Sequence, residues 1–147
     1  MLRVNTFYKI ANYLYRIRIP LLPKLITYFI RLVFSAYVPH TAKIGKNVVF
    51  GYGALGVVIH GKSTIGNNCL ISQNVTLGGT SKREGAPTLG NNVFLATGAK
   101  VLGPVNIGDN VVVGANAVVV NDIPANSLAV GIPAKVIKSN ITMSDYV

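Results

Sequence analysis

The sequence predicts an all-β solenoid that follows a short helical hairpin, and two observations carry this prediction. From residue 38 onward, aliphatic or aromatic residues recur with a period of six, which neither an α-helix nor an ordinary strand produces. Residues 1–36 lack this period and follow a helical pattern instead. A unit of six residues is too short to bury its own apolar face, so successive units must stack into one continuous core.

The six-residue repeat has a lead position and a small position. A glycine often follows the lead directly, as in Ile44-Gly45 and Ile65-Gly66, and a small or apolar residue usually stands four positions after the lead. We expect both the lead and the small residue to face the interior. The leads are Val38, Ile44, Phe50, Ile59, Ile65, Ile71, Leu77, Leu89, Leu95, Val101, Ile107, Val113 and Val119.

The first 36 residues are expected to form two helices. Polar residues recur there at spacings of three or four, namely Asn5, Lys9, Asn12 and Arg16. Pro20 and Pro23 break this pattern, and a second helix is expected from Lys24 to about Ala36. We expect the hairpin to pack on its own domain or on a sister subunit, or to lie on an anionic membrane as a basic amphipathic element.

The charge balance restricts the partners. Fourteen Lys and Arg face four Asp and Glu, for a net charge of +10, which favours a phosphate-rich ligand or an anionic membrane surface. Nucleic acid is not expected, because no recognition-helix, zinc-finger or RNA-binding motif accompanies the charge. One cysteine allows no internal disulfide, and no signal peptide or membrane span is evident. We therefore expect a cytoplasmic protein, with peripheral membrane contact through residues 1–36.

Two interruptions of the repeat indicate where a site lies. Ile59 comes nine positions after Phe50, and Leu89 comes twelve positions after Leu77, instead of six. The second interruption contains the polar, turn-forming segment 81–87, and insertions into solenoids are often binding loops. The expected organisation is a helical segment at 1–37, a β-helix at 38–138 with a loop at 78–88, and a tail at 139–147.

His60 is the candidate general base. If neither insertion changes the coil register, residue 60 stacks next to Gly78, beside a Gly-Gly turn and the long loop. The ordinary pKa of histidine, about 6.5, suits proton abstraction at neutral pH. His40 is the only other histidine and is expected to support the structure. Two histidines and Cys69 do not supply the usual ligands of a catalytic zinc, so no metal is expected.

The repeat resembles that of the hexapeptide-repeat acyltransferases, over about residues 38–124. The segments 73–80 (QNVTLGGT), 97–103 (TGAKVLG) and 130–137 (VGIPAKVI) are similar to serine acetyltransferase. Segment 54–60 (ALGVVIH) resembles the short relatives of that enzyme in polysaccharide gene clusters. The resemblance implies a left-handed parallel β-helix, a hand that the spacing alone does not give and that opposes the usual crossover rule.

The same resemblance implies an acetyl-CoA-dependent O-acetyltransferase that works as a homotrimer, with sites between subunits. His60 would deprotonate the acceptor hydroxyl, which attacks the thioester directly, without a metal or a covalent enzyme intermediate. Gly78 and Gly79 would line the thioester end, Thr97 and Ala115 the pantetheine arm, and Lys135, with Lys100 as a further candidate, would meet the CoA phosphates. These assignments are expectations carried over from the family.

Departures from the family pattern concern the acceptor. The Arg-His-Pro of the serine acetyltransferase loop is replaced by Gly85-Ala86-Pro87, and its Asp-His pair by Tyr52-Gly53. We therefore expect the hydroxyl of a sugar or polysaccharide precursor as the acceptor. The alternative is a serine O-acetyltransferase with relocated serine contacts. An alternative of another class is a non-catalytic, membrane-docked β-helix scaffold.

Overall fold

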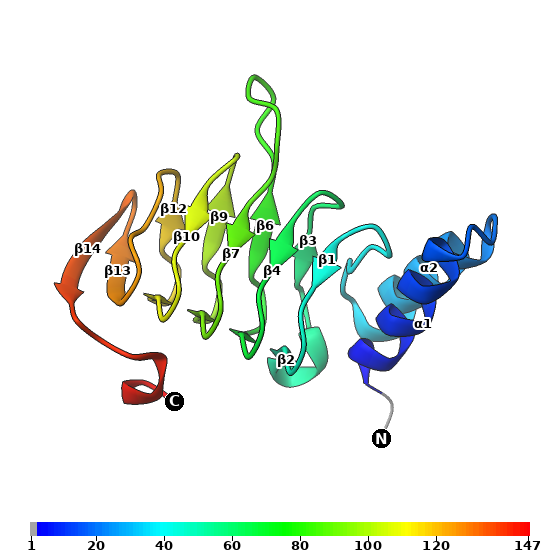
Figure 1. Ribbon diagram of the computed structural model, residues 1–147, viewed down its shortest axis with the longest axis horizontal. Coiled ribbons are helices and arrows are strands. Elements are labelled where there is room, and N and C mark those ends of the chain that lie inside the picture. Colours follow the sequence, from blue (N-terminus) through cyan, green and yellow to red (C-terminus); the bar gives the residue numbers. More distant parts are fainter. Residues whose placement is uncertain (1–2) are drawn as a thin grey trace.

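The computed structural model describes residues 3–147 as a solenoid of short strands with a helical hairpin at one end (Figure 1). Helix α1 spans Val4–Arg16 and helix α2 spans Leu22–Phe34. The strands are β1 (Lys43–Ile44), β2 (Val49–Phe50), β3 (Val58–Ile59), β4 (Thr64–Ile65), β5 (Leu70–Ile71), β6 (Thr76–Gly78), β7 (Thr88–Leu89), β8 (Phe94–Leu95), β9 (Lys100–Leu102), β10 (Asn106–Ile107), β11 (Val112–Val113), β12 (Val118–Val119), β13 (Ser127–Gly131) and β14 (Ala134–Ser139).

The strands form three faces of a prism. The first face has the order β1-β4-β7-β10, the second β2-β5-β8-β11-β13-β14, and the third β3-β6-β9-β12. Within each face, strands from successive coils pair in parallel, except that β14 folds back antiparallel on β13. The predicted all-β solenoid with an N-terminal helical hairpin is confirmed.

The lead residues build the interior, as the period predicts. Ile59, Ile71 and Leu77 are fully buried, and most of the residues that stand four positions after the leads are buried too. Each such aliphatic side chain contributes about 1.5–3 kcal/mol on burial. Ile44 and Phe50 are only half-buried, because the first coil borders a cavity beneath α1.

Both interruptions leave the register intact. Across the first one, Phe50 pairs with Ile71, and the extra residues form the 3-10 turn Gly51–Ala54. Across the second, Ile65 pairs with Leu89, and the extra residues project from the prism as the long loop above β6 in Figure 1. The expectation that neither insertion shifts the coils is confirmed.

Asparagines shape the corner between the first and second faces. Asn47 and Asn68 adopt left-handed backbone conformations, with φ of 54° and 56°. Asparagine tolerates this region better than most residues because its short polar side chain bonds locally. Here Nδ2 of Asn47 donates to Oδ1 of Asn68 at 3.1 Å, so the side chains also join successive coils.

The hairpin covers the open end of the first coil. Helix α2 begins at Leu22, two residues before the predicted start at Lys24, because Pro23 lies in the first turn, where its missing N–H costs no hydrogen bond. The ring of Phe7 in α1 lies 5.0 Å from that of Phe29 in α2. Within residues 3–147, no helix is long and apolar enough to cross a membrane.

Gly66 should be intolerant of a side chain. A Cβ at Gly66 would meet the carbonyl oxygen of Gly90 and would lie 2.9 Å from the backbone nitrogen of Asn91, in the next coil. Since backbone cannot move aside without breaking the stack, Gly66→Ala should lower the free energy of unfolding by about 1–3 kcal/mol. At Gly51 the nearest atom would be 3.5 Å away, so Gly51→Ala should stay within about 0.5 kcal/mol of the wild type. Equal denaturation midpoints for the two variants would contradict this packing.

Candidate active site

His60 lies at the corner between the third and first faces. It directly follows β3, and its backbone N–H donates to the carbonyl oxygen of Leu77 at 2.8 Å. This bond sets His60 beside Gly78 and Gly79 in the next coil, as the repeat count predicts. A Cβ on Gly79 would lie 3.5 Å from Nε2 of His60, which is an ordinary contact distance, so Gly79 is a direct neighbour of the ring.

The other ring nitrogen of His60 has a defined partner. Nδ1 accepts a hydrogen bond from the backbone N–H of Lys62 at 3.2 Å. In this geometry the neutral ring carries its proton on Nε2. The six-residue period does not predict this contact, because the contact depends on the local turn rather than on the repeat.

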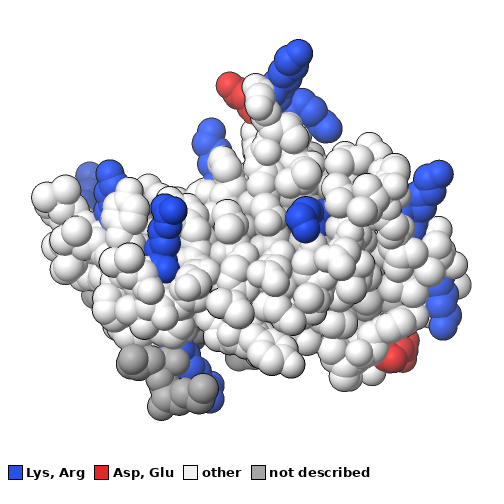
Figure 2. Space-filling view, turned by 180° about the vertical axis from the view of Figure 1, so that it is seen from behind, with Lys and Arg blue, Asp and Glu red and all other residues white. Residues whose placement is uncertain are grey.

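The long loop and His60 border an open surface cavity of about 610 Å³. Basic side chains outnumber acidic ones along it: Lys62, Lys82 and Arg83 against Glu84. The projecting loop with its basic and acidic groups is seen at the top of Figure 2. The cavity is lined by His60, Lys62, Gly79, Thr80, Ser81, Lys82, Arg83, Glu84 and Gly85. Lys62, Lys82 and Arg83 were not among the residues predicted for the site.

Thr97 and Ala115 lie at another corner, between the second and third faces. Both are exposed, and the backbone N–H of Asn116 donates to the carbonyl oxygen of Thr97 at 2.9 Å, so they stack in successive coils. Exposed Lys135 stands on β14, opposite Val130 of β13, one coil further along the same side. Nζ of Lys100 donates to the carbonyl oxygen of Gly98 at 2.7 Å, beside Thr97.

The predicted residues therefore form two groups on opposite edges of the third face. Leu102 pairs with Gly78, and Thr97 lies five residues before Leu102 along the chain. Five extended residues span at most about 18 Å. Within one copy of the chain, the edge that bears His60 and the edge that bears Thr97 are thus separated by the width of a face.

His40 has a structural environment. Its backbone N–H donates to Oγ1 of Thr27 at 3.3 Å, and its Nδ1 lies 2.9 Å from the same oxygen. Because Thr27 donates its own hydroxyl proton to the carbonyl of Pro23, Nδ1 of His40 carries the proton of this contact. Asn12 donates to the carbonyl oxygen of His40 at 2.7 Å. His40 thus joins both helices to the first coil.

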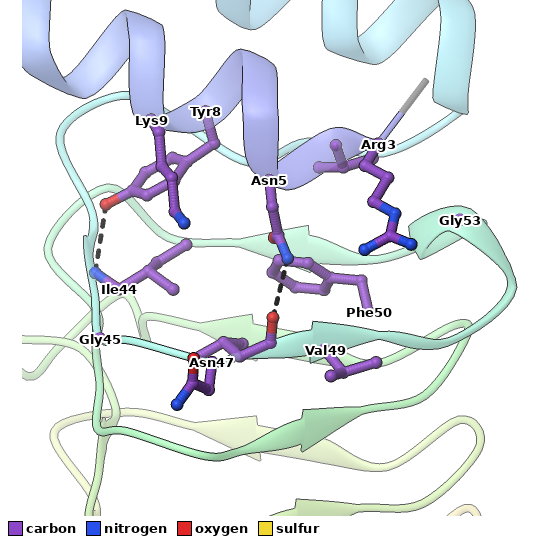
Figure 3. A pocket seen from close by; sticks show the side chains of 12 residues that line it. Arg3, Asn5, Tyr8, Lys9, Ile44, Gly45, Asn47, Val49, Phe50 and Gly53 are labelled. Atoms are coloured by element: carbon purple, nitrogen blue, oxygen red, sulfur yellow. Dashed lines mark hydrogen bonds between the residues drawn. The ribbon is translucent and has the colours of Figure 1, made fainter. Parts of the chain in front are cut away.

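A second cavity, of about 570 Å³, lies between α1 and the first coil (Figure 3). The hydroxyl of Tyr8 donates to the carbonyl of Ala42 at 2.7 Å and accepts from the N–H of Ile44 at 3.1 Å. Burial raises the pKa of Tyr8, so this phenol stays protonated as a donor. Asn5 donates to the carbonyl of Val48 at 2.8 Å. These contacts fix α1 on the solenoid.

Metal ligation and thiol chemistry find little support in residues 3–147. No group of three or more His, Cys, Asp or Glu side chains is placed to hold a metal ion in this part of the chain. Cys69 is buried, its thiol donates to the carbonyl of Gly90 at 3.3 Å, and burial raises its pKa. Cys69 is a packing residue, as its repeat position predicts.

Comparisons with known proteins agree with this architecture. Residues 86–121 match the family described as bacterial transferase hexapeptide (six repeats). Serine acetyltransferase of Synechococcus elongatus is 43% identical over 132 residues, which are 88% of this chain and 54% of that protein. This chain is a left-handed hexapeptide-repeat β-helix that resembles serine acetyltransferase. It spans about half the length of the relatives it matches.

Two solved structures show the same likeness. Soybean serine acetyltransferase complexed with serine superposes with a TM-score of 0.84 at 37% identity. The match covers 89% of this chain and 54% of the soybean chain. Serine acetyltransferase from Brucella abortus in complex with coenzyme A gives a TM-score of 0.89 at 26% identity, over 93% of this chain and 55% of its own.

The environment of His40 predicts a pH dependence of stability. Burial, and secondarily the charge of Lys24, hold the pKa of His40 below its ordinary value. The unfolded chain therefore protonates this ring at a higher pH than the folded chain. The stability that the neutral ring contributes is complete above about pH 6.5 and is lost as the pH falls towards the folded pKa.

His40→Gln should therefore flatten the dependence of unfolding free energy on pH below about pH 6.5, compared with the wild type. Urea titrations at a series of pH values measure this slope. If the variant and the wild type lose stability in parallel on acidification, the neutral ring does not contribute in this way.

Proposed function

We propose that this protein transfers an acetyl group from acetyl-CoA to the hydroxyl of a small acceptor, with His60 as the general base. The observation that supports this most strongly is the corner at which His60 lies beside a Gly-Gly turn and the open cavity under the long loop. The complexes of similar proteins with coenzyme A and with serine support the donor and the reaction class.

The reaction needs one base and a site for the oxyanion. Nε2 of His60 takes the proton of the acceptor hydroxyl while its oxygen attacks the thioester carbonyl carbon. Backbone N–H groups near Gly78 and Gly79 stabilise the resulting oxyanion. The carbon–sulfur bond then breaks, the acetyl ester leaves, and the proton on His60 passes to the CoA thiolate.

The tautomer of His60 has to change for this step. Nε2 can accept a proton only when the neutral ring carries its hydrogen on Nδ1, and the hydrogen bond from Lys62 is then released. A neutral hydrogen bond contributes about 0.5–1.5 kcal/mol, so the reactive tautomer is accessible at modest cost. Binding of the acceptor hydroxyl at Nε2 offsets this cost.

Serine is the acceptor that the comparisons favour, ahead of the sugar hydroxyl that the sequence favoured. The matched relatives are serine acetyltransferases, and one was solved with serine. The charges of the cavity suit a zwitterion, with Arg83 or Lys82 for the carboxylate and Glu84 for the ammonium group. A sugar hydroxyl remains the second candidate, because the Arg-His-Pro of the serine acetyltransferase loop is replaced here by Gly85-Ala86-Pro87.

We further propose that the site is completed between copies in a homotrimer. A single copy places His60 and Thr97 on opposite edges of the third face, and a neighbouring copy that brings its Thr97 edge against His60 would complete the site. The outward residues of the second face are largely apolar, whereas those of the first face are polar. This difference favours the second face as the surface that contacts a neighbouring copy. On the second face they include Val49, Leu70, Phe94 and Leu128, and on the first Lys43, Thr64, Thr88 and Asn106.

A thiol-release assay identifies the acceptor. With acetyl-CoA, serine should raise CoA release well above the rate of hydrolysis in water, and Arg83→Gln should raise the KM for serine more than it lowers kcat. Lys46→Gln removes an equal charge from the far corner and serves as the control. If neutral sugars are acetylated and serine is not, the acceptor assignment changes while the reaction class stands. Without acceptor-dependent release, the proposed function is wrong.

His60→Ala should lower turnover by about 10²–10⁴-fold, the usual contribution of a general base. Binding of CoA should be largely unchanged, because Thr97, Ala115 and Lys135, which are assigned to its pantetheine arm and phosphates, lie on the other edge. His40→Ala is the matched control and should retain most turnover at temperatures where it stays folded. Near-wild-type turnover by His60→Ala would remove this residue from the mechanism.

A further inference from the structure

The outer surface of the hairpin is unusually apolar for an exposed helix. On α2 an apolar stripe recurs at spacings of three, four and seven, so it follows one face of the helix. Leu25 and Leu32 are 62% and 84% exposed, and Leu21, at the turn before α2, is 77% exposed. The stripe consists of Leu22, Leu25, Tyr28, Phe29, Leu32 and Val33. Exposed Ile17 and Ile19 continue it onto the turn between the helices.

Basic residues flank this apolar stripe. Lys24 and Arg31 are exposed on α2 along the edge of the stripe, and Arg16 and Arg18 stand at the turn. The first acidic residue of the whole sequence is Glu84, so the hairpin carries no negative charge. On the face shown in Figure 2, the hairpin end carries basic groups alone, and acidic groups lie on the loop and at the far end.

This charge pattern selects the partner. A second copy of the chain would bring the same net charge of +10 and four acids, all beyond the hairpin, so it offers little to neutralise these cations. An anionic bilayer offers both a hydrocarbon boundary for the apolar stripe and phosphates for the flanking Lys and Arg. Tyr13 and Tyr28, both exposed, have the apolar ring and polar tip that suit the interface.

We propose that the hairpin docks this protein on anionic phospholipid bilayers. Helix α2 lies in the plane of the interface with its apolar stripe towards the acyl chains, and Lys24 and Arg31 reach the headgroups. The prism stands off the surface, because the hairpin occupies one end of the solenoid (Figure 1). The docking is peripheral and reversible, and it weakens with salt because the charge contribution is screened.

Vesicle co-sedimentation tests this proposal with the full chain. Vesicles of equal parts phosphatidylcholine and phosphatidylglycerol should bind the protein at low salt, and vesicles of phosphatidylcholine alone should bind it at least tenfold more weakly. Lys24→Gln with Arg31→Gln should lower the partition coefficient about thirtyfold, since each cation near such a surface contributes about 1 kcal/mol. Leu25→Ser with Leu32→Ser should lower it at least tenfold, because both leucines are exposed and their loss leaves the core intact.

Lys43→Gln with Lys138→Gln is the matched control, because it removes the same charge from the solenoid and should leave binding within twofold. Circular dichroism and light scattering establish the fold and the oligomeric state of each variant. The proposal is overturned if the wild type ignores anionic vesicles at low salt, or if the control variant loses as much binding as Lys24→Gln with Arg31→Gln. It is also overturned if Leu25→Ser with Leu32→Ser binds normally, or if that variant breaks the oligomer instead, which would make the stripe an interface between copies.

Discussion

The whole structure depends on the backbone hydrogen bonds that hold each coil to the next. Before the long insertion, the backbone N–H of Lys43 donates to the carbonyl oxygen of Ser63 at 2.9 Å. After it, the backbone N–H of Thr88 donates to the carbonyl oxygen of Val105 at 2.9 Å. These bonds fix the register of every coil, and the buried leads make any slip costly, since a slip by one residue would turn apolar side chains outward. His60 therefore stays beside Gly78 whatever the loop between Gly79 and Pro87 does.

The repeat predicted the fold and the register because one repeated physical requirement, an inward lead every six residues, specifies both. The sequence analysis did not predict that His60 and Thr97 lie on opposite edges of the third face. The repeat does contain this information, because Ile59 leads a strand of the third face and Leu95 leads a strand of the second. The hydrogen bond between Lys62 and His60 and the start of α2 at Leu22 depend on local turn geometry, which periodicity does not record. The left-handed sense came from the family resemblance, because spacing is the same for either hand.

The two histidines show why residue type alone does not define a catalytic group. His40 contacts Thr27 through both its backbone N–H and its Nδ1, and the ring of Tyr15 lies edge-on to it at 5.1 Å. Its burial keeps it neutral in a structural role. His60 is anchored through its backbone and through Nδ1, and Nε2 is directed to the side of Gly79 and the loop cavity. The two histidines therefore differ in their surroundings: the ring of His40 packs among Thr27 and Tyr15, whereas Nε2 of His60 lies beside a cavity.

The placement of the two predicted groups on opposite edges has a consequence for the proposed activity. The core of one copy is complete, because its coils are stacked and its ends are covered by the hairpin and by β14. The proposed site, by contrast, draws His60 from one copy and Thr97 from its neighbour. Under that proposal, association controls activity. Under the same proposal, the long loop can change its acceptor without altering Thr97 and Ala115, because the third face lies between them.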